Sequence, residues 1–178
     1  LATINVLIES DSAKAKLMLE KLTDLLRVTL KNSRTEQSTI AQEVDLLDAY
    51  LNIQKIRLGE RLTFSIETHE ISDLQVIPPF LIQPLVENAL THGIEPKAAG
   101  GQVNIRITQQ AEQLKIEVSD NGTGLKTPSI AAGHGVGLSN IRQRIDTLYG
   151  DKASLTITEQ AEGGVVSIIL LPMIVAAA

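Results

Sequence analysis

The sequence has no cysteine among its 178 residues, which excludes a disulfide framework and a metal site built from thiolates. This absence suits a reducing compartment. No apolar run reaches the roughly 20 residues that a membrane-spanning helix needs, so we expect no membrane contact from this stretch of chain. No charged segment followed by an apolar one opens the sequence, and a secretory signal peptide is therefore not predicted.

The sequence also lacks an initiating methionine and begins LATINVLIE, in what reads as the middle of a helix. We therefore expect it to be part of a longer protein. Basic residues number 16 against 21 acidic ones, for a formal net charge of −5. This balance argues against a nucleic-acid partner held by bulk charge. The length is enough to bury a core, as one domain or as a domain with a helical extension.

Helical patterns fill the first third of the chain. Residues 1–9 read as the end of a helix, and a second amphipathic helix runs to about Lys31. Thr39 followed three residues later by Gln42 is a capping-box signature for a third helix, which should end near Gly59. Two consecutive amphipathic helices with a short connection predict a helical hairpin. Such a hairpin must pack on the next domain, on a missing part or on a second copy.

From residue 61 onward the apolar residues alternate with polar ones, which is the pattern of half-buried strands. The alternating apolar positions are Leu62, Phe64 and Ile66; Val103, Ile105 and Ile107; Leu114, Ile116 and Val118; and Leu155 and Ile157. The continuous apolar run from Val165 to Leu171 suggests a central strand, and a further helix should end at Gly150. We therefore predict a helical region over residues 1–60 and an α+β domain over 61–178, with a two-layer α/β sandwich whose helices cover one face of the sheet.

The stretch Pro78–Ile94, PPFLIQPLVENALTHGI, predicts an amphipathic helix that opens on prolines and is stopped by Gly93. Its apolar face would comprise Ile82, Leu85, Val86, Ala89 and Leu90. Its other face would carry a carboxylate, an amide and an imidazole, from Glu87, Asn88 and His92. Such a face is either simply solvated or part of a site, and the helix alone does not separate the two readings.

Asp120 continues the phase of the apolar residues in its strand, so its carboxylate should point to the buried side of the sheet. A buried carboxylate is costly unless it accepts hydrogen bonds. Gly122 and Gly124 follow and would let a ligand approach the backbone closely, so the carboxylate could receive the amino group of a purine. Alternatively, Asp120 closes a hairpin through an Asx-turn.

Alternating glycines at 133, 135 and 137 directly precede a helix that opens with Leu138. Backbone N–H groups and the positive end of the helix dipole would favour phosphate there. The segment does not follow a strand of a parallel βαβ unit, which argues against a dinucleotide-binding crossover. A flexible loop is the alternative, because one such motif is weak by itself.

The three motifs together, in this order, resemble the ATP-binding domain of the GHKL superfamily, which includes sensor histidine kinases, DNA gyrase, a heat-shock chaperone and a mismatch-repair protein. The matching residues are Glu87, Asn88 and His92 in the N box, Asp120, Gly122 and Gly124 in the first glycine box, and Gly133, Gly135 and Gly137 in the second. The segments QPLVENALTHGI, YLNIQKIRLGERL and GVGLSNIRQRI narrow the resemblance to LytS-type sensor histidine kinases and extend it over essentially the whole chain.

The resemblance implies a role for each matching residue. Asn88 would hold Mg²⁺ on the phosphates of ATP, and Glu87 would act catalytically by polarising the phosphoacceptor imidazole or serving as its base. His92 would reach the phosphates or support Asn88, and Asp120 would bind the adenine amino group. The pocket would be completed by Gly122, Gly124, Gly133, Gly135, Gly137 and Leu138, with residues 125–134 as the ATP lid. Asn140 and Arg144 also match the family pattern, with no role assigned.

The sequence departs from the family at two places. The phosphoacceptor segment, P-H-F-L-F-N, would lie immediately before Leu1, and His69, His92 and His134 are not plausible substitutes. The chain as given should therefore bind ATP without phosphorylating itself. In the last glycine box Val165 follows Gly163-Gly164 where the family usually has threonine, which removes one hydroxyl from the pocket.

The resemblance implies an ATP-dependent protein histidine kinase of a two-component system. Its partners would be a response regulator and a second copy, which would pair through the helical region, and the full-length protein would be a membrane sensor with this part on the cytoplasmic side. Two alternatives remain open. One is an ATP-gated protein-binding module without phosphotransfer, and the other is a structural interaction domain with accidental motifs.

Overall fold

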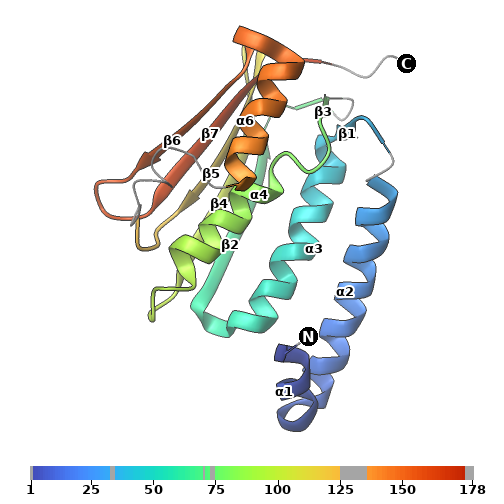
Figure 1. Cartoon of the computed structure of the whole chain (residues 1–178). Helices are drawn as coiled ribbons and strands as arrows, with labels where there is room; N and C mark the ends of the chain where they lie inside the picture. The colour runs from blue at the N-terminus through green and yellow to red at the C-terminus, as the bar shows by residue number, and fades with distance from the viewer. Residues whose placement is uncertain (1, 33–34, 70, 73–74, 125–135, 175–178) are drawn as a thin grey trace.

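A computed structural model describes residues 2–32, 35–69, 71–72, 75–124 and 136–174 (Figure 1). The elements are α1 (Ala2–Ser10), α2 (Ser12–Asn32), β1 (Ser38–Thr39), α3 (Ile40–Leu58), the 3₁₀ turn η1 (Gly59–Arg61), β2 (Leu62–His69), β3 (Val76–Ile77), α4 (Gln83–Asn88), the π-helix η2 (Ala89–Ile94), β4 (Gly101–Gln110), β5 (Gln113–Asp120), α6 (Val136–Tyr149), the 3₁₀ turn η3 (Gly150–Lys152), β6 (Ser154–Glu159) and β7 (Val165–Pro172). Within the described ranges, no helix combines the length and the apolarity that a membrane span requires.

Five strands form one sheet in the order β2-β4-β5-β7-β6. Strands β2 and β4 pair in parallel, and the other three pairings are antiparallel. The sheet is therefore mixed and mostly antiparallel. Strand β7 pairs with β5 on one side and β6 on the other, which agrees with the central position that its apolar run suggests.

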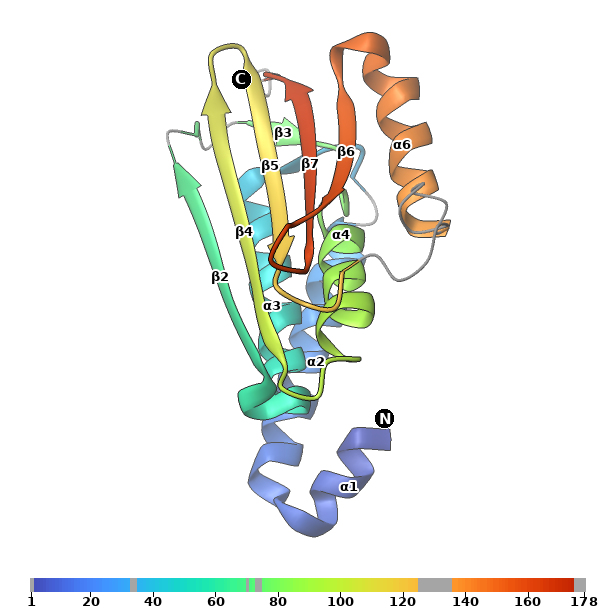
Figure 2. The same ribbon diagram turned by 90° about the vertical axis from the view of Figure 1, so that its left-hand side faces the viewer.

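Helices cover one face of this sheet, as predicted. Figure 2 shows α3, α4 and α6 on the same side of the five strands. The inward-facing strand residues Leu62, Val103, Ile105, Ile107, Leu114, Ile116, Val118, Ile169 and Leu171 are buried against apolar residues of these helices. The apolar residues of the alternating pattern thus face the core, and the polar residues between them face the uncovered side of the sheet.

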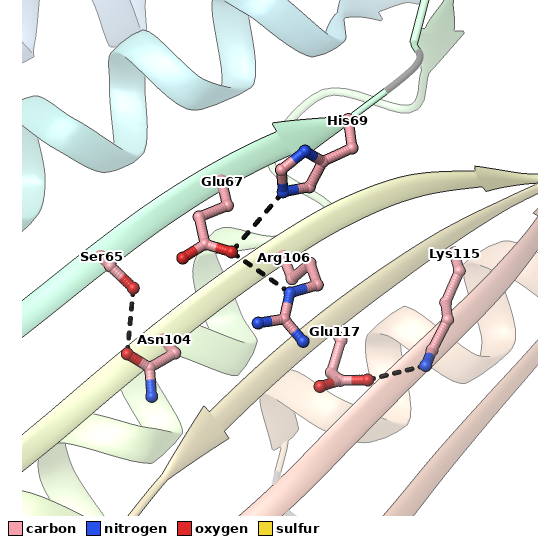
Figure 3. Close-up of polar contacts among 7 residues, drawn as sticks. All are labelled: Ser65, Glu67, His69, Asn104, Arg106, Lys115 and Glu117. Atoms are coloured by element: carbon pink, nitrogen blue, oxygen red, sulfur yellow. Dashed lines mark hydrogen bonds and ion pairs between the residues drawn. The ribbon is translucent and has the colours of Figure 1, made fainter.

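Over β2, β4 and β5 the opposite face of the sheet is polar (Figure 3), whereas β7 carries the partly exposed Val166, Ile168 and Leu170 on that side. Neighbouring strands are linked across it by side chains: Ser65 Oγ donates to Asn104 Oδ1 at 3.0 Å, and Arg106 Nε lies 3.3 Å from a carboxylate oxygen of Glu67. Along β5, Lys115 Nζ lies 2.7 Å from Glu117 Oε2. Ion pairs with this much access to solvent contribute little individually to stability.

Helix α3 belongs to two apolar clusters. Ile40, Leu47 and Leu51 lie in the large core between helices and sheet, whereas Ile53 joins a small cluster with Ile4 and Met18 of the first two helices. The capping box that the sequence predicts is present at its start. The helical hairpin is therefore confirmed, but its second helix also packs on the sheet. The boundary between residues 60 and 61 stays a prediction.

The predicted helix over residues 78–94 needs correction at both ends. Helix α4 begins only at Gln83, because Phe80 has a φ of 58°, in the left-handed region that interrupts a right-handed helix. At the other end the helix continues as a π-helix, η2, to Ile94. Gly93 therefore lies inside the helical segment and does not stop it. π-Helical turns are rare and are frequent at functional sites.

Candidate nucleotide site

The α4–η2 segment separates apolar from polar residues as the sequence predicts. Its apolar side chains are buried, namely Ile82, Leu85, Val86, Ala89 and Leu90. Glu87 and Asn88 are half-buried, and His92 is exposed. Glu87 is oriented by Gln83, one turn earlier, whose amide donates to Glu87 Oε1 at 2.7 Å. The segment thus presents three polar groups from a helix that is fixed by the core.

Asp120 is the last residue of β5 and lies opposite Val103 of β4. Its side chain is buried, with 4% of the residue exposed. Oδ1 accepts a hydrogen bond from the backbone N–H of Gly122 at 2.8 Å. Burial raises the pKa of Asp120, and the N–H groups of Gly122 and Val165 and the charge of Lys97 only partly oppose this. The structure therefore holds a costly buried acceptor where the sequence predicts one.

Three glycines from different segments allow close packing around Asp120. A Cβ atom on Gly93 would lie 2.5 Å from Asp120 Oδ1. A Cβ on Gly122 would collide with the backbone of Gly93, and one on Gly164 would collide with the carbonyl of Asp120. Thr123 N also donates to the carbonyl of Gly93 at 3.1 Å. The π-helix, the end of β5 and the start of β7 can approach this closely only because these positions lack side chains.

Asp120 forms part of the wall of a narrow cavity of about 30 Å³. The cavity is lined by Leu85, Asn88, Ala89, His92, Gly93, Val118, Asp120, Gly124, Leu138, Ile157, Val165 and Ser167. Most of these groups are apolar, with few polar atoms, which suits a flat heteroaromatic ring. The cavity is too small for a purine as it stands, so binding requires the walls to move apart.

Five predicted residues, Asn88, His92, Asp120, Gly124 and Leu138, are brought together in this cavity. Glu87, Gly122 and Gly137 are not among its lining residues, although Gly122 packs against the π-helix behind it. Gly137 lies in the first turn of α6. The predicted residues Gly133 and Gly135, and the predicted lid over residues 125–134, fall outside the described residues.

Glu87 instead faces helix α3. Burial, followed by the neighbouring Glu87 carboxylate, raises the pKa of Tyr50 to about 12. Tyr50 belongs to α3 and is partly buried. The carboxylate that the family resemblance makes catalytic therefore lies on the side of α4 that meets the N-terminal helical region, and not in the cavity wall.

Sequence reasoning misses Gly93 and Ser167 as cavity residues. The pattern identifies Gly93 only as a helix stop, although its place directly after His92 could have signalled a close backbone approach. Ser167 is the only polar residue in the apolar run from Val165 to Leu171, and its burial, with 8% exposed, shows why that exception matters. It supplies a hydroxyl two residues beyond the position where the family usually has threonine.

A second, larger hollow of about 810 Å³ lies between α6 and β3. It is lined by Glu36, Gln37, Val76, Ile77, Pro78, Asn140, Gln143, Arg144, Thr147, Leu148, Tyr149 and Ile174. Size alone would favour it, but its lining includes neither a residue predicted to contact nucleotide nor a buried carboxylate. The smaller cavity, with its convergent glycines and Asp120, fits nucleotide chemistry better.

The described residues contain no group of three or more histidine, cysteine, aspartate or glutamate side chains that could hold a metal ion. A protein-built cage is therefore not found there. Mg²⁺ in nucleotide sites needs only one or two protein oxygens, because phosphate and water supply the rest. Asn88, half-buried at the cavity wall, is a suitable single oxygen ligand of this kind.

Comparison with known families gives two matches. A histidine kinase family model matches residues 1–62, and the model of histidine kinase-, DNA gyrase B- and HSP90-like ATPases matches residues 79–174. The second match covers more than half of the chain and contains all the residues predicted for the nucleotide site.

Among curated relatives, the sensor protein LytS of Streptococcus mutans is 32% identical over 172 residues, which are 90% of this chain and 29% of the relative. The chain thus spans less than a third of that protein. Among solved structures, the histidine kinase domain of the Erythrobacter litoralis blue-light-activated kinase has a TM-score of 0.61 at 19% identity, covering 90% of this chain and 75% of that one.

The histidine kinase ThkA, solved in complex with the response regulator protein TrrA, has a TM-score of 0.58 at 18% identity, covering 90% of this chain and 49% of that one. At these identities the two structures support the fold alone. The family follows from the sequence models and the site residues. The chain belongs to the family of histidine kinase-, DNA gyrase B- and HSP90-like ATPases, and over most of its length it is similar to sensor proteins named LytS.

Proposed function

We propose that this chain is the kinase core of a two-component sensor histidine kinase, which binds Mg-ATP and supplies the γ-phosphoryl group to a histidine outside the sequence given. The buried Asp120 carboxylate at the cavity wall carries this proposal. A folded protein retains a buried acceptor at such cost only where a donor or another strong interaction repays it.

In this proposal the exocyclic amino group of adenine donates to Asp120. The ring lies against the apolar cavity wall formed by residues such as Leu85, Val118 and Ile157. The close approach of Gly93 and Gly122 fixes the backbone next to the position of the base. Phosphate binds near the N-terminal end of α6, where the N–H groups of the first turn and the helix dipole favour negative charge.

Asn88 is the proposed protein ligand of Mg²⁺. When bound, the ion would offset the negative charge of the phosphates. His92, next to it on the cavity wall, would donate to a phosphate oxygen. These residues orient the γ-phosphoryl group, which is most of what a phosphoryl-transfer enzyme must do.

In the transfer, a bond forms between an imidazole nitrogen and the γ-phosphorus as the bond to the leaving oxygen of ADP breaks. Glu87 polarises the imidazole, or accepts its proton, so that the lone pair of the attacking nitrogen is available to form the new bond. This role suits its position, because Glu87 lies on the side of α4 that faces helix α3 and not the cavity wall.

The proposal includes three partners and a location. The first partner is ATP, and the phosphoryl group passes on to an aspartate of a response regulator. A second copy pairs through the first two helices, which carry the exposed apolar residues Val6, Ile8, Leu17, Leu19, Leu26 and Leu30. The full-length protein is a membrane sensor, with this part on the cytoplasmic side where ATP is available. The last three elements rest on the sequence resemblance.

Calorimetric titration of the protein with Mg-ADP tests the nucleotide site. We expect saturable binding that is lost in Asn88→Ala and retained in Asn104→Ala, a matched control on the polar face of the sheet. Circular dichroism of each variant verifies folding. Folded wild-type protein that binds neither Mg-ADP nor Mg-ATP would overturn the proposal and favour a nucleotide-independent interaction domain.

A further inference from the structure

One peptide group joins three helices of this protein. The N–H of Phe80 donates to Glu43 Oε1 at 3.0 Å, and the carbonyl of Pro79, in the same peptide group, accepts from Arg144 Nη1 at 2.6 Å. Glu43 belongs to α3, Arg144 to α6, and the peptide group lies just before α4. A carboxylate and a guanidinium thus bind the opposite ends of one amide dipole, which strengthens both hydrogen bonds.

Glu43 is the less expected of the two residues. It is fully buried, with 0% exposed, whereas glutamates on helices almost always reach solvent. Burial raises its pKa, and the N–H groups of Phe80, Leu81 and Ile82 oppose this. The carboxylate therefore lies against the N–H groups that open the α4 segment. One of these N–H groups, that of Phe80, donates a hydrogen bond to Glu43 Oε1.

The bound peptide group holds a strained turn. Phe80 has a φ of 58°, which a bulky residue adopts only where surrounding contacts impose it. Both hydrogen bonds come from outside the turn, and they fix the direction in which the chain enters α4. The turn is therefore set by α3 and α6, and not by its own sequence preferences.

The turn lies close to the proposed nucleotide site along a short, continuous segment. Gln83, the first residue of α4, donates to Glu87 Oε1, and Asn88 is the last residue of the same helix. At the far end of the segment, Arg57 of α3 pairs with Glu95, and Arg61 Nη2 donates to the carbonyl of Glu95 at 2.9 Å. Helix α3 and the turn that follows it thus hold both ends of α4–η2.

We propose that Glu43 and Arg144 are positioning residues that set the orientation of α4, and so of Glu87 and Asn88, through the shared Pro79–Phe80 peptide group. We call Glu43, Arg144 and the peptide group between them the clamp. Its effect on nucleotide binding rests on the proposed function, but the clamp itself can be tested without nucleotide. Neither residue lines the cavity beside Asp120, so both act through the helix.

Hydrogen exchange followed by mass spectrometry, without nucleotide, tests the clamp. Glu43→Met keeps the volume but removes the acceptor, and Glu43→Gln keeps an acceptor oxygen. We expect exchange in residues 80–90 to be at least about tenfold faster in Glu43→Met, and near wild type in Glu43→Gln. Asp45→Ala, at an exposed acidic residue of the same helix, is the matched control and should change nothing.

Arg144→Met provides the second test, because Arg144 is only partly buried and its removal is less disruptive to folding. We expect the same local increase in exchange, with Gln143→Ala on the exposed side of α6 as the control. Unchanged exchange of residues 80–90 in Arg144→Met would overturn the inference. So would equal exchange in Glu43→Met and Glu43→Gln.

Mg-ADP titrations of the same variants then link the clamp to the site. Each of Glu43→Met and Arg144→Met should weaken binding several-fold, and the double variant should lose less than the product of the two, since both act on one peptide group. Independent losses would mean two separate structural roles, against the proposal. If wild-type protein binds no nucleotide, the proposed function fails while the exchange result still decides the clamp.

Discussion

Two regions of this protein each bury a carboxylate, and they use it differently. Asp120 and Glu43 are both buried, both have a raised pKa, and each accepts a backbone N–H at the start of a turn. Asp120 adjoins a cavity, whereas Glu43 adjoins the packed junction of α3 and α4. The same costly group is thus available to a ligand in one region and is used to fix a helix in the other.

Asp120→Asn should produce the largest effect. The asparagine oxygen can still accept from Gly122, so its amide would turn an N–H₂ group toward the cavity, opposite the donor of adenine. We expect Mg-ADP affinity to fall at least about 100-fold, to below detection, with an unchanged fold by circular dichroism. Unaltered affinity in calorimetry would refute the adenine role and make Asp120 a structural residue like Glu43.

Glu43 variants should reveal the structural use of the other carboxylate. Glu43→Gln keeps the hydrogen bond to Phe80 and removes the charge, while Glu43→Met leaves that N–H buried without a partner. We expect the unfolding free energy of Glu43→Met to be lower than that of Glu43→Gln by about 1–3 kcal/mol. Urea denaturation measures this difference. Equal stabilities would show that the acceptor contributes nothing to the fold.

The pH dependence of stability compares both carboxylates at once. Burial raises the folded-state pKa of Asp120 above its ordinary value of 3.8, and that of Glu43 above 4.5. The folded state therefore binds these protons more tightly than the unfolded state does. The resulting stabilisation is full below the ordinary pKa values and is lost as pH rises through the folded-state pKa values. Each tenfold difference in proton affinity between the two states corresponds to about 1.4 kcal/mol.

The Asp120→Asn, Glu43→Gln double variant lacks both groups. Relative to it, wild-type protein should gain stability in urea denaturation as pH is lowered from neutral toward 3.8. Nucleotide affinity of the wild type should fall over the same range, because a protonated Asp120 carboxyl group is a weaker acceptor for the amino group of adenine than the carboxylate is. A constant stability difference between the two proteins would mean that neither pKa is raised in solution.

Val165→Thr should have the smallest effect. It restores the hydroxyl that the family usually has after Gly-Gly, at a position that lines the cavity. Ser167 already supplies a hydroxyl to the same wall, so we expect the affinity for Mg-ADP to rise by no more than about tenfold. A loss of affinity would show that the extra polar atom has no partner in the bound state.

Much of the fold can be predicted because its signals are local. Alternation predicts the strands, and the Thr39–Gln42 pair predicts the start of α3, since both reflect contacts between near neighbours in sequence. The position of Asp120 on the buried side also follows from alternation alone. The assignment of the motif to ATP requires the family resemblance, because a buried aspartate has several uses.

The features that cannot be predicted depend on distant contacts. The sequence places the start of α4 too early, because the turn at Phe80 is held by Glu43 and Arg144, which lie 37 and 65 positions from their hydrogen-bond partners. The π-helical turn at Gly93 follows from its approach to Asp120 and Gly122, which no local pattern encodes. Both departures lie next to the candidate site, where local preferences commonly yield to function.

The parallel pairing of β2 with β4 has a practical consequence for anyone producing this domain. The ATPase family match begins at residue 79, but β2 ends before it and pairs with β4 over eight residues, from Leu62 to His69. A protein trimmed to the match would present β4 as a long, unprotected edge strand, with a row of unpaired N–H and C=O groups open to a neighbouring molecule. Recombinant boundaries drawn N-terminal to α3 avoid this route to aggregation.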